Sequence, residues 1–332
     1  ELMNYLNDFK DFKILILSNH KFIGNRFFLY NYQNYKNIIK VENYILCTLL
    51  FYLKKYKTLC LDVHHYSTKE NSIIYKYFEK IPKKKINFEH SELAKEILQR
   101  KKIQVKKNFV CIHVRNSFLK KYDKEFIRNA KIETFNETIN WLLKANYTVV
   151  FLGEYGSIEY KFNHENLIDI TSIKLSKNEK NIVDLYLCAN CYFYIGTQSG
   201  LHYLACYFNR PILLTNMIPL SHAHSINKNG ISIPKLFRFK NTKKLLTFKE
   251  MIELNIYNER LQVNYEKKNI EIIDNTNEDI LVSVKNLHEL INSKRVIFSK
   301  ETKFQVKIRD ILKNSPVKYS VYSNASFCDL FL

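Results

Sequence analysis

Residues 194–205 read Tyr-Ile-Gly-Thr-Gln-Ser-Gly-Leu-His-Tyr-Leu-Ala, the pattern of a strand, a glycine turn and a helix in succession. An apolar run ends at Ile195, two glycines enclose a short polar turn at 196–200, and a helical pattern begins near Leu201. The free N–H groups and the positive dipole end at the start of such a helix form a site for an anion. The stretch therefore predicts an α/β fold with a diphosphate site at this turn.

This turn differs from the two common phosphate-binding loops. It has neither the Gly-Lys-Ser/Thr of a Walker loop nor the spacing of Gly-x-Gly-x-x-Gly, which argues against a P-loop NTPase and a dinucleotide oxidoreductase. A plain N-capped helix after a tight turn is the alternative that the local sequence leaves open. The candidate donor-binding residues of the turn are Gly196, Thr197, Ser199, Gly200 and Leu201.

Short β-branched runs alternate with helix-period segments on both sides of the turn, which is typical of βαβ units and a parallel sheet. We expect strands at 109–114, 148–152, 167–170, 192–195 and 211–215, and helices at 134–144, 181–189 and 201–208. Beyond Pro234, we expect helices at 248–254, 280–292 and 302–312, with a polar loop at 264–278. This order predicts a doubly wound, Rossmann-like domain.

The first third of the chain has an α/β pattern as well. We expect strands at 13–17 and 59–63, and helices at 41–56, 70–80 and 92–99, the last with Ser91 as its N-cap. The basic stretch 100–107 connects the two halves. Two facing Rossmann-like domains, 1–104 and 105–332, are therefore expected.

Composition narrows the class of protein. The 332 residues are 46% hydrophobic and 25% charged, which excludes disorder for most of the chain. The net charge of +20 favours anionic partners. The basic residues are dispersed and mostly Lys, so we expect a peripheral membrane contact and no nucleic acid.

The cysteines and the chain start indicate a cytoplasmic location. Seven cysteines, mostly within apolar segments, are typical of buried thiols in a reducing compartment. Cys188 and Cys191 have the Cys-x-x-Cys spacing, but no second pair completes a zinc site. The start, Glu1-Leu-Met-Asn, lacks the pattern of a signal peptide, and a first residue other than Met suggests a trimmed chain.

Five of the six glycines follow expected strands, where ligands bind in open α/β sheets. Gly153, after the strand at 148–152, is for this reason a further candidate donor-binding residue.

A second candidate site lies in Val110-Cys-Ile-His-Val-Arg-Asn116. His113 and Arg115 alternate on one face near the end of a strand, and Arg is suited to bidentate phosphate binding. For His113, the roles of base, phosphate donor and buried hydrogen-bonded residue all stay open. The polar, mixed-charge segment 117–130 is a candidate lid over the site.

Several segments together resemble a bacterial family of glycosyltransferases from surface-polysaccharide gene clusters. The segments are 109–116, 126–130, 147–153, 184–216, and 233–235 with 246–248. More distantly, His113-Val-Arg115 resembles the His-x-Arg motif of fucosyltransferases, and 184–211 resembles the nucleotide-sugar segment of lipopolysaccharide heptosyltransferases.

The resemblance implies a GT-B-like fold, with the donor in the cleft between an acceptor-side domain, 1–104, and a nucleotide-sugar-binding domain, 105–332. In the family a His often follows the N-terminal loop glycine, whereas here Asn25 follows Gly24. His20 is the candidate that would replace it as the catalytic base. The fucosyltransferase motif usually continues with an acidic residue, and here Asn116 stands there.

No Asp-x-Asp occurs in the chain, so we expect neither a metal nor another cofactor. His222 and His224 have no third candidate ligand nearby and are interpreted as ordinary loop histidines. Without a metal, the charge of the leaving group must be neutralised by protein groups. The candidates are Arg115, the turn at 196–201, Lys235 and Arg128.

The expected function is metal-independent transfer of a hexosyl or deoxyhexosyl group, in the manner of a fucosyltransferase. The donor is a nucleotide sugar, and the acceptor is a surface glycan, a lipid-linked glycan or a protein. One alternative is a nucleotide-sugar epimerase of GT-B-like fold. A third is a non-catalytic protein that binds sugar phosphates or nucleic acid.

Overall fold

The centre of the molecule is a parallel β-sheet. The computed structural model describes residues 14–17, 38–41, 85–116, 126–158, 163–219, 230–257, 259–292 and 326–327. In this part of the chain the sheet has the strand order β11-β8-β7-β6-β3-β4-β5, and every neighbouring pair is parallel. Its strands are β3 (Phe109–His113), β4 (Thr148–Phe151), β5 (Leu167–Asp169), β6 (Phe193–Gly196), β7 (Ile212–Met217), β8 (Gly230–Pro234) and β11 (Ser326–Phe327). The expected α/β class with a Rossmann-like sheet is confirmed.

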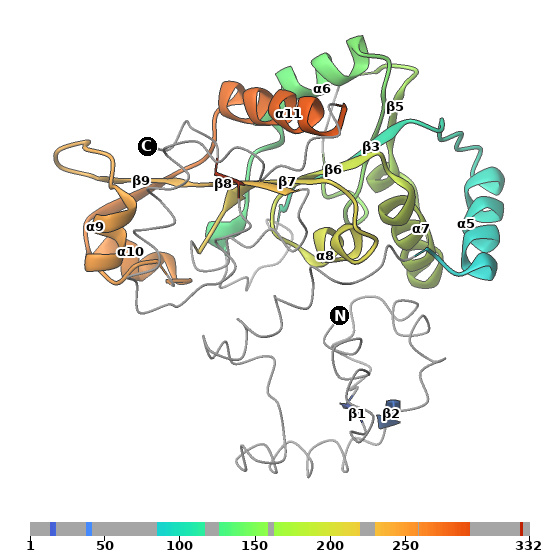
Figure 1. Ribbon diagram of the computed structural model, residues 1–332, viewed down its shortest axis with the longest axis horizontal. Coiled ribbons are helices and arrows are strands. Elements are labelled where there is room, and N and C mark those ends of the chain that lie inside the picture. Colours follow the sequence, from blue (N-terminus) through green and yellow to red (C-terminus); the bar gives the residue numbers. More distant parts are fainter. Residues whose placement is uncertain are drawn as a thin grey trace.

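Helices cover both faces of this sheet (Figure 1). One face carries α6 (Asn136–Lys144), preceded by the 3-10 turn Ile132–Phe135, and α11 (Asn277–Asn292). The other face carries α7 (Lys177–Asn190) and α8 (Gly200–Tyr207), and α5 (Phe88–Arg100) packs against α7 from outside. Helix α5 precedes the boundary expected at 104/105, yet its buried side chains belong to the same core as this sheet.

The core follows the period-two alternation of the strands. Along β3, Phe109 and Cys111 lie in the cluster beneath α7 and α8, whereas Val110 and Ile112 lie in the cluster beneath α6 and α11. Because strands buried on both faces are apolar throughout, these runs were visible in the sequence.

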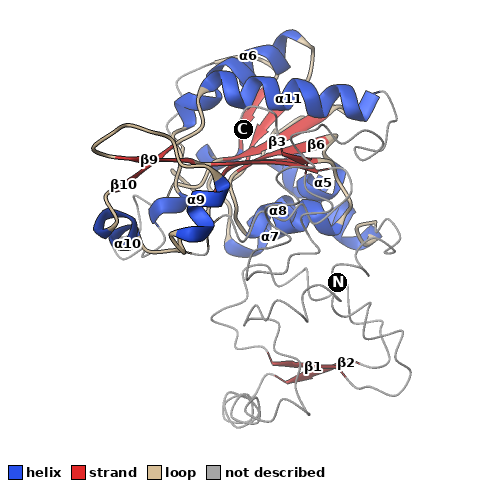
Figure 2. Ribbon diagram, turned by 60° about the vertical axis from the view of Figure 1, so that its left-hand side comes forward, coloured by secondary structure: helices blue, strands red, loops and turns tan. Residues whose placement is uncertain are grey.

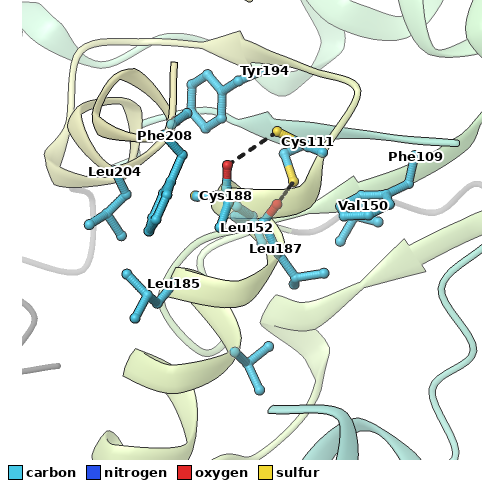
Figure 3. Close-up of a cluster of buried hydrophobic side chains, with 14 of the residues drawn as sticks. Phe109, Cys111, Val150, Leu152, Leu185, Leu187, Cys188, Tyr194, Leu204 and Phe208 are labelled. Carbon is cyan, nitrogen blue, oxygen red and sulfur yellow. Dashed lines mark hydrogen bonds between the residues drawn. The ribbon is translucent and has the colours of Figure 1, made fainter. Parts of the chain in front are cut away.

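The cysteines of the described segments are structural. Figure 3 shows Cys111 and Cys188 among apolar side chains, with the Cys111 thiol 3.7 Å from the Leu187 carbonyl oxygen. Cys191 ends α7, and its thiol lies 3.6 Å from the Cys188 carbonyl oxygen. Burial raises the pKa of the Cys111 and Cys188 thiols well above the usual range. The interpretation of Cys188 and Cys191 as buried thiols therefore holds.

A small unit extends from one side of the sheet (Figure 2). It consists of the antiparallel strands β9 (Leu236–Phe239) and β10 (Ile270–Ile273) with α9 (Phe248–Glu253) and α10 (Gln262–Lys267), and we call it the appended unit. The prediction of a loop at 264–278 is wrong, because this segment contains the end of α10, the whole of β10 and the start of α11. β10 is three-quarters Ile, and its Glu271 pairs across the strands with Arg238 of β9 at 2.7 Å, which adds to the stability of the two strands.

The structure corrects one helix start. Helix α5 begins at Phe88 rather than Glu92, and its N-cap is Asn87 rather than Ser91. The Asn87 side-chain oxygen accepts a hydrogen bond of 2.8 Å from the Glu89 N–H. Asn is as strong an N-cap as Ser, so the earlier of the two possible caps is used.

Few of the N-terminal expectations fall on described residues. Strands β1 (Ile14–Leu17) and β2 (Ile38–Val41) pair in parallel, so Val41 ends a strand rather than beginning a helix. The expected elements at 59–63, 70–80 and 302–312 lie outside the described residues. Among the helices that are described, none is long and apolar enough to cross a membrane.

Candidate functional site

The candidate site lies where the order of strands reverses. The chain runs from β3 outward to β4 and β5, and then returns to the other side of β3 to form β6. The carboxyl ends of β3 and β6 are adjacent, with His113 opposite Gly196. Ligands of open α/β sheets bind outside the carboxyl ends of the strands at such a switch point.

Two hydrogen bonds fix the loops that leave β3 and β6. The Arg115 N–H donates to the Thr197 hydroxyl oxygen at 2.7 Å, and the Thr197 N–H donates to the His113 carbonyl oxygen at 3.0 Å. A Cβ on Gly196 would lie 2.1 Å from this same carbonyl oxygen. Gly196 is therefore required for the close approach of the two strands.

The turn after β6 is an N-capped start of α8. The Ser199 hydroxyl oxygen accepts a hydrogen bond of 3.2 Å from the Leu201 N–H, and the Ser199 N–H donates to Nδ1 of His202 at 2.9 Å. Gly200 begins the helix and is exposed, and a Cβ there would meet nothing within 4 Å. The capped helix and the anion site are thus compatible, because capping leaves space above Gly200.

The Ser199 cap leads to a first prediction. Ser199→Ala is expected to lower the free energy of unfolding by about 1 kcal/mol, because the N-cap is lost. Urea denaturation checks this, and nucleotide titration should show a loss on the order of 1–2 kcal/mol if the hydroxyl also bonds the ligand. Ser199→Asp, which caps equally well but adds a negative charge, should restore stability and not nucleotide binding. Equal nucleotide affinity in all three proteins would contradict a diphosphate at this turn.

Three cations surround His113 at this edge of the sheet. Burial lowers the pKa of His113 to about 3, and the positive charges of Lys180, Arg115 and Arg128 lower it further. The imidazole is therefore neutral at pH 7. An anion bound at these cations would offset their charge and raise the pKa of His113 again.

Elements far apart in the sequence supply these cations. Arg128, at the end of the 3-10 turn Phe126–Arg128, donates from Nη2 to the Gln198 carbonyl oxygen at 2.8 Å. This contact brings the described end of the candidate lid to the turn after β6. Lys180 lies in the first turns of α7 and forms an ion pair with the buried Asp184. Burial raises the pKa of the Asp184 carboxyl.

His113 offers a polar atom to this site. Its Nδ1 is buried and has no hydrogen-bond partner among the residues that the structure describes. The structure therefore shows His113 as a neutral imidazole whose Nδ1 has no hydrogen-bond partner among the described residues. With a pKa of about 3, it is not protonated at pH 7.

Gly153 lies close to His113. It follows β4, and a Cβ there would lie 2.7 Å from the Ser157 hydroxyl oxygen and 3.9 Å from Cδ2 of His113. A side chain at this position would collide with the Ser157 side chain and would only touch the imidazole, so Gly153 keeps the turn after β4 compact beside His113.

Lys235 lies at the same edge but farther from the turn. It follows β8, which is separated from β6 by β7, so the two strand ends are about 10 Å apart. Its Nζ donates to the Asn129 carbonyl oxygen and to Asp274 Oδ1, both at 2.6 Å. Burial lowers its pKa, whereas Asp274 acts in the opposite direction. Its charge is thus already paired.

Other predicted site residues cannot be placed. His20, Gly24, His222, His224 and 117–125 of the candidate lid lie outside the described residues. The structure brings together His113, Arg115, Arg128, Gly153 and the turn at 196–201. No group of three or more His, Cys, Asp or Glu side chains in the described segments could hold a metal ion.

Sequence reasoning missed Lys180 and His202. Lys180 and Asp184 have the i, i+4 spacing of a helical ion pair, but only the strand order shows that this helix starts beside His113. His202 stands three residues after Ser199, at the capping-box position, where the usual residue is Glu or Gln. The spacing of a capping box was therefore present in the sequence, but with His in place of Glu or Gln.

No protein-family model and no curated protein sequence matches the chain. Among solved structures, it is similar to the E. coli ADP-heptose lipopolysaccharide heptosyltransferase II, with a TM-score of 0.41, 14% identity, and coverage of 73% of this chain and 62% of that one. It is also similar to TibC of enterotoxigenic E. coli, a dodecameric iron-containing heptosyltransferase, with a TM-score of 0.33, 17% identity, and coverage of 57% and 47%. For the UDP-GlcNAc 2-epimerase of Methanocaldococcus jannaschii, the TM-score is 0.29 at 10% identity, with coverage of 78% and 57%.

The chain thus spans less than two thirds of the length of each of these proteins. At such identities and TM-scores, the likeness assigns neither a donor nor a reaction to this chain.

Proposed function

We propose that the protein is a glycosyltransferase that takes its sugar from a nucleotide-diphosphate donor bound at the β3–β6 switch point. The observation that carries this proposal is that Arg115 and Arg128 contact Thr197 and Gln198 of the turn before α8, next to the N-terminus of that helix. Lys180 lies nearby but is already paired with Asp184. A diphosphate carries two or more negative charges, and such a ligand suits two arginines and a helix N-terminus.

The same residues can stabilise the departing nucleotide. In sugar transfer, the bond between the anomeric carbon and the diphosphate oxygen breaks, and negative charge develops on the diphosphate. The acceptor hydroxyl oxygen forms the new bond and releases its proton. Cations and N–H groups held in place before the reaction lower the energy of this charge without having to reorganise. The backbone of Arg115 is fixed by its hydrogen bond to Thr197, which places the start of this side chain at the switch point.

We propose His113 as the group that senses the donor. Its low pKa follows first from burial and then from the surrounding cations, so the charge of a bound diphosphate offsets only the second cause and raises the pKa in part. The neutral imidazole can exchange a hydrogen bond with the donor through Nδ1, which has no partner among the described residues. His20 stays a proposal for the acceptor base, together with the acceptor-side domain over residues 1–104.

The donor class can be tested directly. Thermal-shift and calorimetric titration with UDP, GDP, CDP and ADP sugars should reveal one nucleotide that stabilises the protein. Transfer of labelled sugar to an acceptor then distinguishes a transferase from an epimerase, which would interconvert the free nucleotide sugar. A protein that no nucleotide diphosphate stabilises would contradict the proposal.

Because the proposed cations are protein side chains, activity is expected to survive EDTA. The measurement is sugar transfer after dialysis against EDTA, compared with the same sample after adding Mg²⁺, Mn²⁺ or Fe²⁺. Unchanged rates in all samples are the expected result. Activity that is lost on chelation and restored by one of these ions would show that a metal neutralises the leaving group.

A further inference from the structure

A cavity of about 520 Å³ lies between the short segment 127–131 and the appended unit. Arg128 points from this segment to the Gln198 carbonyl oxygen, whereas its neighbours Ile127 and Asn129 line the cavity. Segment 127–131 is therefore a shared wall, with the proposed diphosphate site on one side and this cavity on the other.

A buried ion pair forms part of the lining. The side chain of Lys235 is 4% exposed, and its Nζ donates to Asn129 and to Asp274 Oδ1. An ammonium group has three N–H donors, so one is left without an acceptor among the described residues. Asp274 is 29% exposed at its side chain, and its Oδ2 likewise has no donor in the described segments. The pair thus offers the cavity one donor and one acceptor side by side.

The rest of the lining is mixed in character. Ile127, Ile270 and Ile272 provide apolar surface, and Gln262 and Glu266 project from one side of α10. Tyr265 also lines the cavity, but it is only 1% exposed and stacks on Phe237 with ring centroids 5.5 Å apart. Lys131, Lys240 and Lys243 also line the cavity. The described lining therefore has ammonium, carboxylate and amide groups beside an aliphatic surface, and no open aromatic face on which a base could stack.

We propose that this cavity binds a hydroxyl-rich carbohydrate ring. Of two neighbouring ring hydroxyls, one accepts a hydrogen bond from the third N–H of Lys235 and the other donates to Asp274 Oδ2. The C–H face of the ring packs on the isoleucines. The volume is within the range of small-molecule sites and suits one or two sugar units. The binding needs no nucleotide, so it does not depend on the proposed function.

The test is saturation-transfer NMR on the full chain without nucleotide, with the methyl glycosides of glucose, galactose, mannose and N-acetylglucosamine as probes. At least one glycoside should bind. Gln262→Trp, which fills the cavity from α10, should weaken this binding by about tenfold or more, equivalent to roughly 1.4 kcal/mol. Val263→Trp is the matched control, because Val263 is exposed on the same helix and outside the lining, and it should leave binding unchanged.

Asp274→Asn tests the ion pair while keeping the shape of the side chain. It should weaken glycoside binding severalfold, and a urea titration shows whether the variant is folded. Three outcomes would overturn the proposal: no glycoside binds, Gln262→Trp binds as the unmodified protein does, or uridine and adenosine bind in place of glycosides and are displaced by Gln262→Trp. Nucleotide titration of the same samples tests the diphosphate site separately. If the nucleotide binds and no glycoside does, only the carbohydrate proposal is contradicted.

Discussion

Arg115→Lys is expected to weaken nucleotide-diphosphate binding by about tenfold or more, although the positive charge is kept. The guanidinium is a planar fork with five N–H donors, and it can hold two phosphate oxygens at once. Lysine provides a single point charge on a flexible stem. The backbone bond from Arg115 to Thr197 does not involve the side chain, so the loop that follows β3 should stay in place.

Calorimetric titration with the stabilising nucleotide measures this effect. Arg100→Lys is the control, because Arg100 lies exposed on α5 and pairs with Glu179, away from the β3–β6 switch point. It should bind the nucleotide as the unmodified protein does. If Arg115→Lys also keeps normal affinity, Arg115 does not bind phosphate in a bidentate manner, and Arg128 and Lys180 would have to carry the site.

The sequence predicted most inner strands of the sheet but missed β8 (Gly230–Pro234), although all five of its residues are buried. β3, β4, β6 and β7 are continuous apolar runs, which are recognisable without knowledge of their neighbours. β10 was missed although Ile270-Glu-Ile-Ile273 is mostly apolar, because the surrounding 264–278 segment is polar. Its partner strand β9 lies too far away in the chain for the pairing to be visible in a local window of sequence.

The candidate site was predictable only where its residues lie in local sequence patterns. Arg115 and the turn at 196–201 could be named from residue types, and the structure brings them together through the strand order. Neither the ion pair of Lys235 with Asp274, 39 residues away, nor the position of Lys180 beside His113 follows from local pattern. Both depend on which strands become neighbours, and that is decided by the packing of the whole domain.

The two glycines of the turn have different roles that the sequence could not separate. Gly196 is in contact with the protein itself, since a Cβ would overlap the His113 carbonyl oxygen at 2.1 Å. Gly200 has no protein atom within 4 Å of where its Cβ would be. The expected consequence is that a side chain at 196 disturbs the fold, whereas one at 200 disturbs only a ligand.

Gly200→Val is therefore expected to weaken nucleotide binding strongly in a folded protein. Val is a better helix former than Gly, so the free energy of unfolding should change by less than about 1 kcal/mol. The branched side chain occupies the space above the first turn of α8, where the diphosphate would approach the N–H groups. We expect the affinity to fall by about a hundredfold, equivalent to roughly 2.7 kcal/mol, in the same calorimetric titration.

Gly196→Ala is the matched comparison and should behave in the opposite way. Its single added carbon collides with the β3 backbone, so the free energy of unfolding should fall by about 3 kcal/mol, as measured by urea denaturation. If Gly200→Val is folded and binds the nucleotide normally, the diphosphate does not lie on this helix. Residues 196–200 would then be a plain capped turn, and the cations around His113 would need a different anionic ligand. A loss of binding confined to Gly200→Val, with stability lost only in Gly196→Ala, would instead locate the diphosphate at the first turn of α8.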